Sequence, residues 1–143
     1  MAFGLWTSKL SAEKSAEVAN QFFNAIESGD FAKVADIFAA DAEIWHNPDE
    51  VVVPPTTTLR TLKAMHKYIA NIKYENKQVR SWPGGFVEQH VLSGVRKVDG
   101  GKVRLPACIV CEVNAEGKIT RLDEYFDSAA QNLFSRPPAK AKM

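Results

Sequence analysis

The chain has 143 residues, with 18 Lys and Arg against 17 Asp and Glu, a net charge of +1 and 45% hydrophobic residues. This length predicts one domain with a core of its own. Because the basic residues are scattered and the apolar residues come in short pieces, we expect neither a nucleic-acid nor a membrane partner, and we expect a soluble, cytoplasmic protein.

Three amphipathic segments in the first half of the chain predict helices. The first covers about residues 11–28, where Ser11 can cap the helix and apolar residues recur on one face. The second repeats this pattern over residues 31–42, and the stretch "EIWHNPDE", residues 43–50, then predicts a strand. The third helix is expected over residues 56–72, behind a run of threonines.

From residue 73 onward the apolar pattern changes to a period of two, which predicts strands. The turn compositions "PGG", "DGG" and "NAEG" separate them, as expected for hairpins. The predicted strands cover residues 73–81, 84–96, 102–113 and 117–127.

Helices followed by a meander of strands predict an α+β fold, in which the helices cover one face of the sheet. We expect one domain over residues 11–130, with an N-terminal extension over residues 1–10. Residues 131–143 contain two prolines and no apolar periodicity, so we expect a mobile C-terminal tail.

Cysteine and histidine usage gives little support to a bound metal. Cys108 and Cys111 lie three residues apart in one predicted strand, too close for an ordinary structural disulfide, so we expect reduced thiols in the core. None of the histidines has a cysteine neighbour at the spacing of a zinc site.

Two stretches, "FFNAIESGDFAKVADIFAADAEIWHNP" and "EGKITRLDEYFD", resemble the nuclear transport factor 2-like superfamily, and within it the SnoaL-like and limonene-epoxide-hydrolase-like branch. The resemblance covers about residues 11–130. It implies a cone: three helices on a strongly curved mixed or antiparallel sheet, with the first strand beside the last, around a mostly apolar pocket. The superfamily contains isomerases, cyclases, epoxide hydrolases, dehydratases and proteins without catalysis, so the fold alone does not imply one reaction.

Comparison with ketosteroid isomerases of the same superfamily argues against that reaction. Alignment on Gly29 and Asp30 places Phe22 at the tyrosine donor and Asn47 at the carboxylate base, and Ile109 falls at the acid donor. Phe22 and Ile109 cannot donate hydrogen bonds, and a neutral amide is no base. We therefore expect Phe22 and Ile109 to line the pocket without taking part in proton transfer.

The epoxide-hydrolase branch matches more closely in chemical type. Its Tyr-x-Asn pair on the first core strand corresponds to Trp45-x-Asn47, and Glu124 replaces the aspartate that activates water. Its Arg-x-Asp pair on a middle strand corresponds to Glu88-x-His90. This chain therefore keeps a carboxylate base and an amide at the matching positions. The arginine of the middle strand is replaced by Glu88, and the aspartate that follows it in that pair is replaced by His90.

Strand alternation assigns faces to these residues. Trp45 and Asn47 share one face, which the resemblance assigns to the pocket, and His46 points to the other. Glu88, His90 and Leu92 share a face of their strand, as do Leu122, Glu124 and Phe126. His90 and Glu124 are then two strand spacings apart, and the bending of the sheet brings them within reach of direct or one-water contact.

We predict a small cofactor-free enzyme that acts by general acid–base chemistry on an apolar cyclic molecule, by hydrolysis of an epoxide, cyclisation, isomerisation or dehydration. Glu124 is the predicted base, directly or through a water held with Asn47, and His90 the predicted proton donor. The predicted substrate contacts are Trp45, Asn47, Phe22, Glu88, Ile109, Leu122 and Phe126.

Three alternatives stay open. A buried Glu beside a His is often a satisfied structural pair, and Glu88 fits equally well at the rim of the sheet. The pocket of a non-catalytic protein would bind an apolar ligand without turnover. The outer face of the sheet, with Val87, Gln89 and Val91, predicts a homodimer that is compatible with either function.

Overall fold

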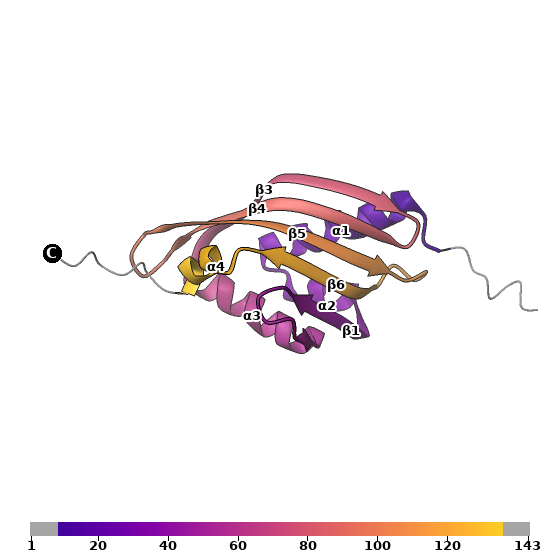
Figure 1. Ribbon diagram of the computed structural model, residues 1–143, viewed down its shortest axis with the longest axis horizontal. Helices are drawn as coiled ribbons and strands as arrows, with labels where there is room; N and C mark the ends of the chain where they lie inside the picture. Colours follow the sequence, from indigo (N-terminus) through magenta and orange to yellow (C-terminus); the bar gives the residue numbers. More distant parts are fainter. Residues whose placement is uncertain (1–8, 136–143) are drawn as a thin grey trace, which may run out of the picture.

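The computed structural model describes residues 9–135 as four helices packed on a six-stranded mixed sheet. Strands β3 and β4 curve over helix α1 at one side of the molecule, and β6 and β1 face α2 and α3 at the other (Figure 1). The expected α+β cone is confirmed, and the sheet is not closed into a barrel. No helix among these residues is long and apolar enough to cross a membrane.

The first two helices begin and end at residues that the sequence supplies for that purpose. Helix α1 spans Ala12–Ser28, and the Ser11 side chain accepts a hydrogen bond from the Lys14 amide. Gly29 ends α1 with φ of 76°, a left-handed conformation that glycine adopts without steric cost. Helix α2 spans Phe31–Ile37 and is capped by Asp30. It is shorter than expected, because the chain turns into strand β1 at Phe38.

The third helix, α3, spans Pro55–Tyr68, and the expectation that it reaches residue 72 is wrong. Ile69 and Ile72 belong to strand β3, Ile69–Trp82, yet both are buried. A bulge at Asn71, with φ of 55°, inserts one extra residue into β3 between its pairs with β4. The bulge places two apolar residues three positions apart on one face, which imitates the spacing of a helix.

The sheet has the order β2-β1-β6-β5-β4-β3, so the first long strand does lie beside the last one. β1 and β6 run parallel, and the other neighbours are antiparallel. β1 occupies 38–46 rather than the expected 43–50, so Asn47 follows the strand. The remaining strands are β2 Val52–Val53, β4 Gly85–Arg96, β5 Lys102–Val113 and β6 Ile119–Phe126.

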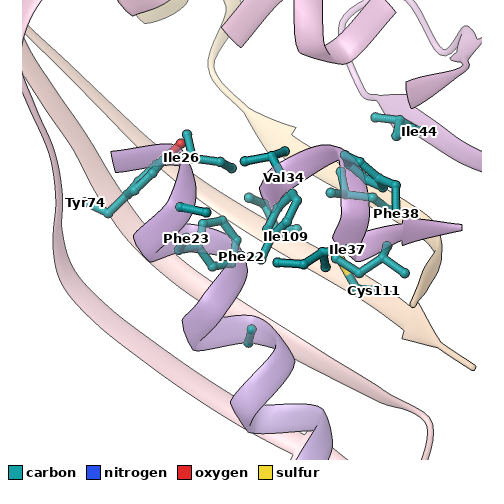
Figure 2. Close-up of a cluster of buried hydrophobic side chains, with 14 of the residues drawn as sticks. Phe22, Phe23, Ile26, Val34, Ile37, Phe38, Ile44, Tyr74, Ile109 and Cys111 are labelled. Carbon is teal, nitrogen blue, oxygen red and sulfur yellow. The ribbon is translucent and has the colours of Figure 1, made fainter. Parts of the chain in front are cut away.

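The core fills the concave side of the sheet, between the strands and helices α1 and α2 (Figure 2). Phe22 packs edge-to-face on Phe23 and on Phe38, with ring centroids 5.1 and 5.3 Å apart. Cys111 is buried in this core, and Cys108 is half-buried on the other face of β5. Both thiols are free, as expected, and burial is the main reason that the pKa of each is raised.

A fourth helix, α4, spans Ser128–Ser135 and was not expected from the sequence. Its carbonyl at Leu133 accepts a hydrogen bond of 2.8 Å from Nη1 of Arg96, which is buried. The same guanidinium binds both carboxylate oxygens of Asp99 at 3.0 Å. Part of the segment expected as a mobile tail is thus helical and attached to the end of β4, and residues 136–143 lie outside the described residues.

Candidate active site

A buried carboxylate–imidazole pair lies on strand β4. Glu88 and His90 share the concave face through strand alternation, and their side chains are 0% and 1% exposed. Oε1 of Glu88 lies 2.6 Å from Nδ1 of His90, which is hydrogen-bond distance. The contact uses Nδ1 and leaves Nε2, the other ring nitrogen, for proton transfer.

The second carboxylate oxygen of Glu88 lacks a hydrogen-bond partner. Oε2 of Glu88 is buried and has no hydrogen-bond partner among residues 9–135. A buried, unpaired carboxylate oxygen is costly, because it has lost its water and gained nothing in exchange. The unpartnered Oε2 is therefore a candidate position for a ligand, a water or a proton, although Ser15 Oγ and Thr58 Oγ1 are also buried without a partner.

Two aromatic residues enclose the His90 ring. The ring of Tyr74, from β3, lies 4.4 Å from it, and that of Phe23, from α1, lies 5.5 Å away. Burial, followed by the negative charges of Glu124, Glu88 and Glu27, raises the pKa of Tyr74 well above its ordinary value. The phenol therefore keeps its proton at neutral pH and is uncharged.

A second carboxylate–imidazole pair joins strands β1 and β6. The two strands pair in parallel with His46 opposite Glu124, and Nε2 of His46 lies 3.1 Å from Oε1 of Glu124. The side chains are 31% and 21% exposed, so this pair lies nearer the solvent than the first. Burial alone would lower the pKa of His46, but the hydrogen bond and charge of Glu124, together with Asp49, raise it above its ordinary value.

The structure therefore changes the partners that the sequence predicted. His90 and Glu124 both lie on the concave side, but each has another partner, and the buried Ile109 is paired between Glu88 and Glu124. Two strand spacings place the backbones of the two pairs roughly 10 Å apart. The alternative position of Glu88 at the rim is wrong, because its side chain is fully buried.

The face assigned to Trp45 is wrong, and so is the one assigned to His46. The Trp45 ring packs on Tyr125 at 5.2 Å, and Tyr125 is 47% exposed on the convex side. The neighbouring Ile44 is fully buried in the core, so alternation places His46 on the concave side. Neighbouring residues of a strand point to opposite faces of the sheet, so the wrong face for Trp45 also gave the wrong face for His46.

Asn47 binds the main chain of β6. Its Nδ2 donates to the carbonyl of Phe126 at 3.1 Å, and its Oδ1 accepts from the amide of Phe126 at 2.9 Å. Its own amide donates to the carbonyl of Glu124 at 3.1 Å. These contacts occupy the side chain, so the expectation that Asn47 holds a water for Glu124 is not supported by its geometry.

The other expected substrate contacts are part of the packed core. Phe22, Ile109 and Leu122 are buried, and half-buried Phe126 lies 5.9 Å from the His46 ring. Figure 2 shows Phe22, Phe23 and Ile109 among the buried side chains of this core. The apolar walls are present, and side chains rather than open space occupy the interior.

Two hollows indent the described part of the chain, and neither includes Glu88, His90 or Glu124. One, of about 380 Å³, lies between α1, the end of α2 and the β5–β6 turn. The other, of about 210 Å³, is lined by Tyr68, Arg96, Lys97, Val98 and Phe134, beside α4. Neither of these hollows is the expected pocket beside the two pairs.

Sequence reasoning missed two residues of this site, His46 and Tyr74. The signal for His46 was available: Ala42 and Ile44 are apolar at alternate positions, and His46 continues their face. Tyr74 gave no such signal, because the bulges at Asn71 and Asn76 break the alternation of β3 on both sides of it. Within residues 9–135, no three His, Cys, Asp or Glu side chains are grouped as a metal site would need.

Comparison with known proteins agrees with this architecture. The model of the SnoaL-like domain matches residues 19–122. Similar solved structures include IdmH of Streptomyces antibioticus, provisionally described as a polyketide cyclase (TM-score 0.74, 12% identity, 85% of this chain and 97% of that one). An epoxide hydrolase of the limonene-epoxide-hydrolase-like type from M. tuberculosis has a TM-score of 0.68 and 18% identity, with 86% and 90% covered.

A third similar structure is an NTF2-like protein of Burkholderia xenovorans, with a TM-score of 0.71, 17% identity and coverage of 89% and 99%. At these identities the structural matches show the fold alone. No curated protein matches the chain significantly.

Proposed function

From the premise that this chain belongs to the SnoaL-like domain family of the nuclear transport factor 2-like superfamily, we propose that it is a small enzyme using general acid–base chemistry on an apolar cyclic molecule. The observation that carries the proposal is the buried Glu88–His90 pair with an unpartnered carboxylate oxygen. Such a pair is expensive to bury, and proton transfer is a reason to keep it.

Each pair has its own part in the proposed reaction. Glu124, which is partly exposed, takes a proton from a water or from the substrate. His90 gives a proton from Nε2 to the substrate oxygen at the other end, and Glu88 stabilises the ring through Nδ1. The substrate lies along the concave side past Ile109, whose strand separates the two pairs.

In the hydrolysis of an epoxide, the proton that Glu124 would accept and the proton that His90 would donate balance each other. The water oxygen forms a bond to a ring carbon while Glu124 accepts the water proton, and the C–O bond that breaks leaves an oxygen that takes the proton of His90. The two pairs then exchange one proton through solvent and return to their starting states. Proton acceptor and donor both come from side chains, so the proposed reaction needs no cofactor. Cyclisation, isomerisation and dehydration use the same two groups.

The rival proposal is a non-catalytic protein that binds an apolar molecule or another protein. The packed interior favours it, because neither hollow reaches the two pairs. The buried Glu88–His90 pair favours the enzyme, because binding of an apolar ligand needs neither a carboxylate nor an imidazole.

Turnover of a panel of apolar epoxides and cyclic enones tests the proposal. Glu124→Gln keeps the shape and removes the proton acceptor, so kcat should fall by about 10²–10⁴-fold while Kd for the substrate changes little. His90→Asn should also lower kcat, and the two losses should not add, because both residues serve one proton path.

Glu112→Gln is the matched control, since Glu112 is an exposed carboxylate on β5 at the residue paired with Gly85. It should leave kcat unchanged. Full activity of Glu124→Gln would rule out this mechanism. Absence of turnover across the panel, with Kd values altered by the substitutions, would favour the binding protein.

A further inference from the structure

Two consecutive residues, His46 and Asn47, hold the end of strand β6 where Glu124 lies. Asn47 forms three hydrogen bonds with the main chain of Glu124 and Phe126, at 2.9 to 3.1 Å. His46 adds a contact of 3.1 Å to the Glu124 carboxylate itself. The backbone and the side chain of Glu124 are thus fixed by two consecutive residues at the end of β1.

This arrangement extends a parallel pairing beyond the point where it would normally stop. β1 ends at His46, and Pro48, which has no amide hydrogen, follows two residues later. The side chain of Asn47 supplies a donor and an acceptor to Phe126 in place of a further strand residue. The last paired residues are His46 and Glu124, and the Asn47 side chain holds the β6 main chain as far as Phe126. The chain itself turns away through a bond from the Glu50 amide to the His46 carbonyl.

We propose that His46 and Asn47 are positioning residues for Glu124: Asn47 fixes the backbone of β6, and His46 holds Oε1 so that the other carboxylate oxygen faces the reacting proton. This inference rests on the proposed function, in which Glu124 is the base. The role proposed for His46 and Asn47 is to orient Glu124. It differs from packing in the core and from the binding of a water by Asn47.

The charges around His46 make its titration a direct reporter of this contact. Glu124 on β6 and Asp49 in the loop after β1 are the negative groups that raise the pKa of His46, against the lowering effect of burial. In Glu124→Gln both contributions of Glu124 disappear and burial remains, so the pKa of His46 should fall. His66 is the internal control: its Nε2 contacts the carbonyl of Ile26 and not a residue of β6, so its NMR signal should not change.

The experiment combines histidine titration by NMR with turnover kinetics. We expect the His46 signal alone to shift in Glu124→Gln, which requires no substrate. In His46→Ala we expect kcat to fall about 10- to 100-fold with little change in KM, as for other residues that orient a reacting group. His46→Gln, which keeps a donor amide, should recover most of kcat and should remove the part of the pH–rate profile that follows the His46 titration.

The outcomes separate the two proposals. An unchanged His46 titration in Glu124→Gln, or full kcat in His46→Ala, would overturn the positioning role even if Glu124 proved essential. A shifted titration without turnover of any tested epoxide or enone would support the contact and count against the proposed reaction. Loss of kcat equal in His46→Ala and His46→Gln, with Asn47→Ala unimpaired, would contradict positioning by this dipeptide.

Discussion

The Glu88–His90 pair makes a prediction about stability that separates a functional from a structural role. His90→Leu removes one partner and leaves the Glu88 carboxylate fully buried with neither oxygen satisfied. Breaking a buried pair in this way costs about 3–5 kcal/mol of the free energy of unfolding. Glu88→Met leaves only the Nδ1 hydrogen of a neutral imidazole without a partner, which costs about 1–3 kcal/mol.

The double variant should recover what the single variants lose. With Glu88→Met and His90→Leu together, no polar group remains at the site, and replacement of a buried pair by apolar residues is neutral or stabilises by about 1–4 kcal/mol. The single losses would add to roughly 6 kcal/mol if they were independent. The gap between that sum and the measured double variant is the coupling energy of the pair.

Urea unfolding measures the free energy of unfolding of the wild type, the two single variants and the double variant. With an m-value of about 2 kcal/mol per molar, His90→Leu should lower the unfolding midpoint by roughly 2 M, and the double variant should lie at or above the wild type. Gln21→Leu, at an exposed position of helix α1, is the control and should change the free energy of unfolding by no more than about 0.5 kcal/mol. A double variant less stable than either single variant would refute the reasoning and show that the pair is kept for stability.

Two further predictions concern other surfaces of the fold. We propose that the chain forms a homodimer through the convex sheet face, so light scattering at micromolar concentration should show a dimer that Val91→Glu converts to a monomer, and a monomeric wild type would contradict the proposal. In Gly101→Ala the new Cβ would clash with Nη2 of Arg96 and disturb its bonds to Asp99 and Leu133. Hydrogen exchange should then speed up in α4 by more than in β4 and β5, and uniform protection in α4 would show that Arg96 does not hold that helix.

Much of the fold could be predicted because local patterns determine it. Ser11 and Gly29 mark the ends of α1, and alternation along β4 places Glu88 and His90 on the face that the structure gives them. The β1–β6 neighbourhood came from the family resemblance, since no local pattern in either strand predicts a parallel partner some 80 residues away.

The candidate site was harder to predict, because it depends on register rather than on pattern. His46 meets Glu124 only because two parallel strands pair at those residues, and a shift of one position would bring Trp45 there instead. The bulges at Asn71 and Asn76 had the same effect on β3, where they hid Tyr74 and made Ile69 and Ile72 look helical. The sequence could therefore predict which residue types the site contains, but not which side chains contact each other.

The packed interior affects how fast, as well as how tightly, any ligand can bind. Aromatic and aliphatic side chains occupy the space beside His90, and neither described hollow opens there. A ligand that reaches His90 must therefore wait for the protein to open, so its association rate at high concentration is limited by that opening and not by diffusion. Its apparent Kd equals the intrinsic Kd divided by the fraction of open molecules, and a substitution that loosens the core would tighten binding while it weakened the fold.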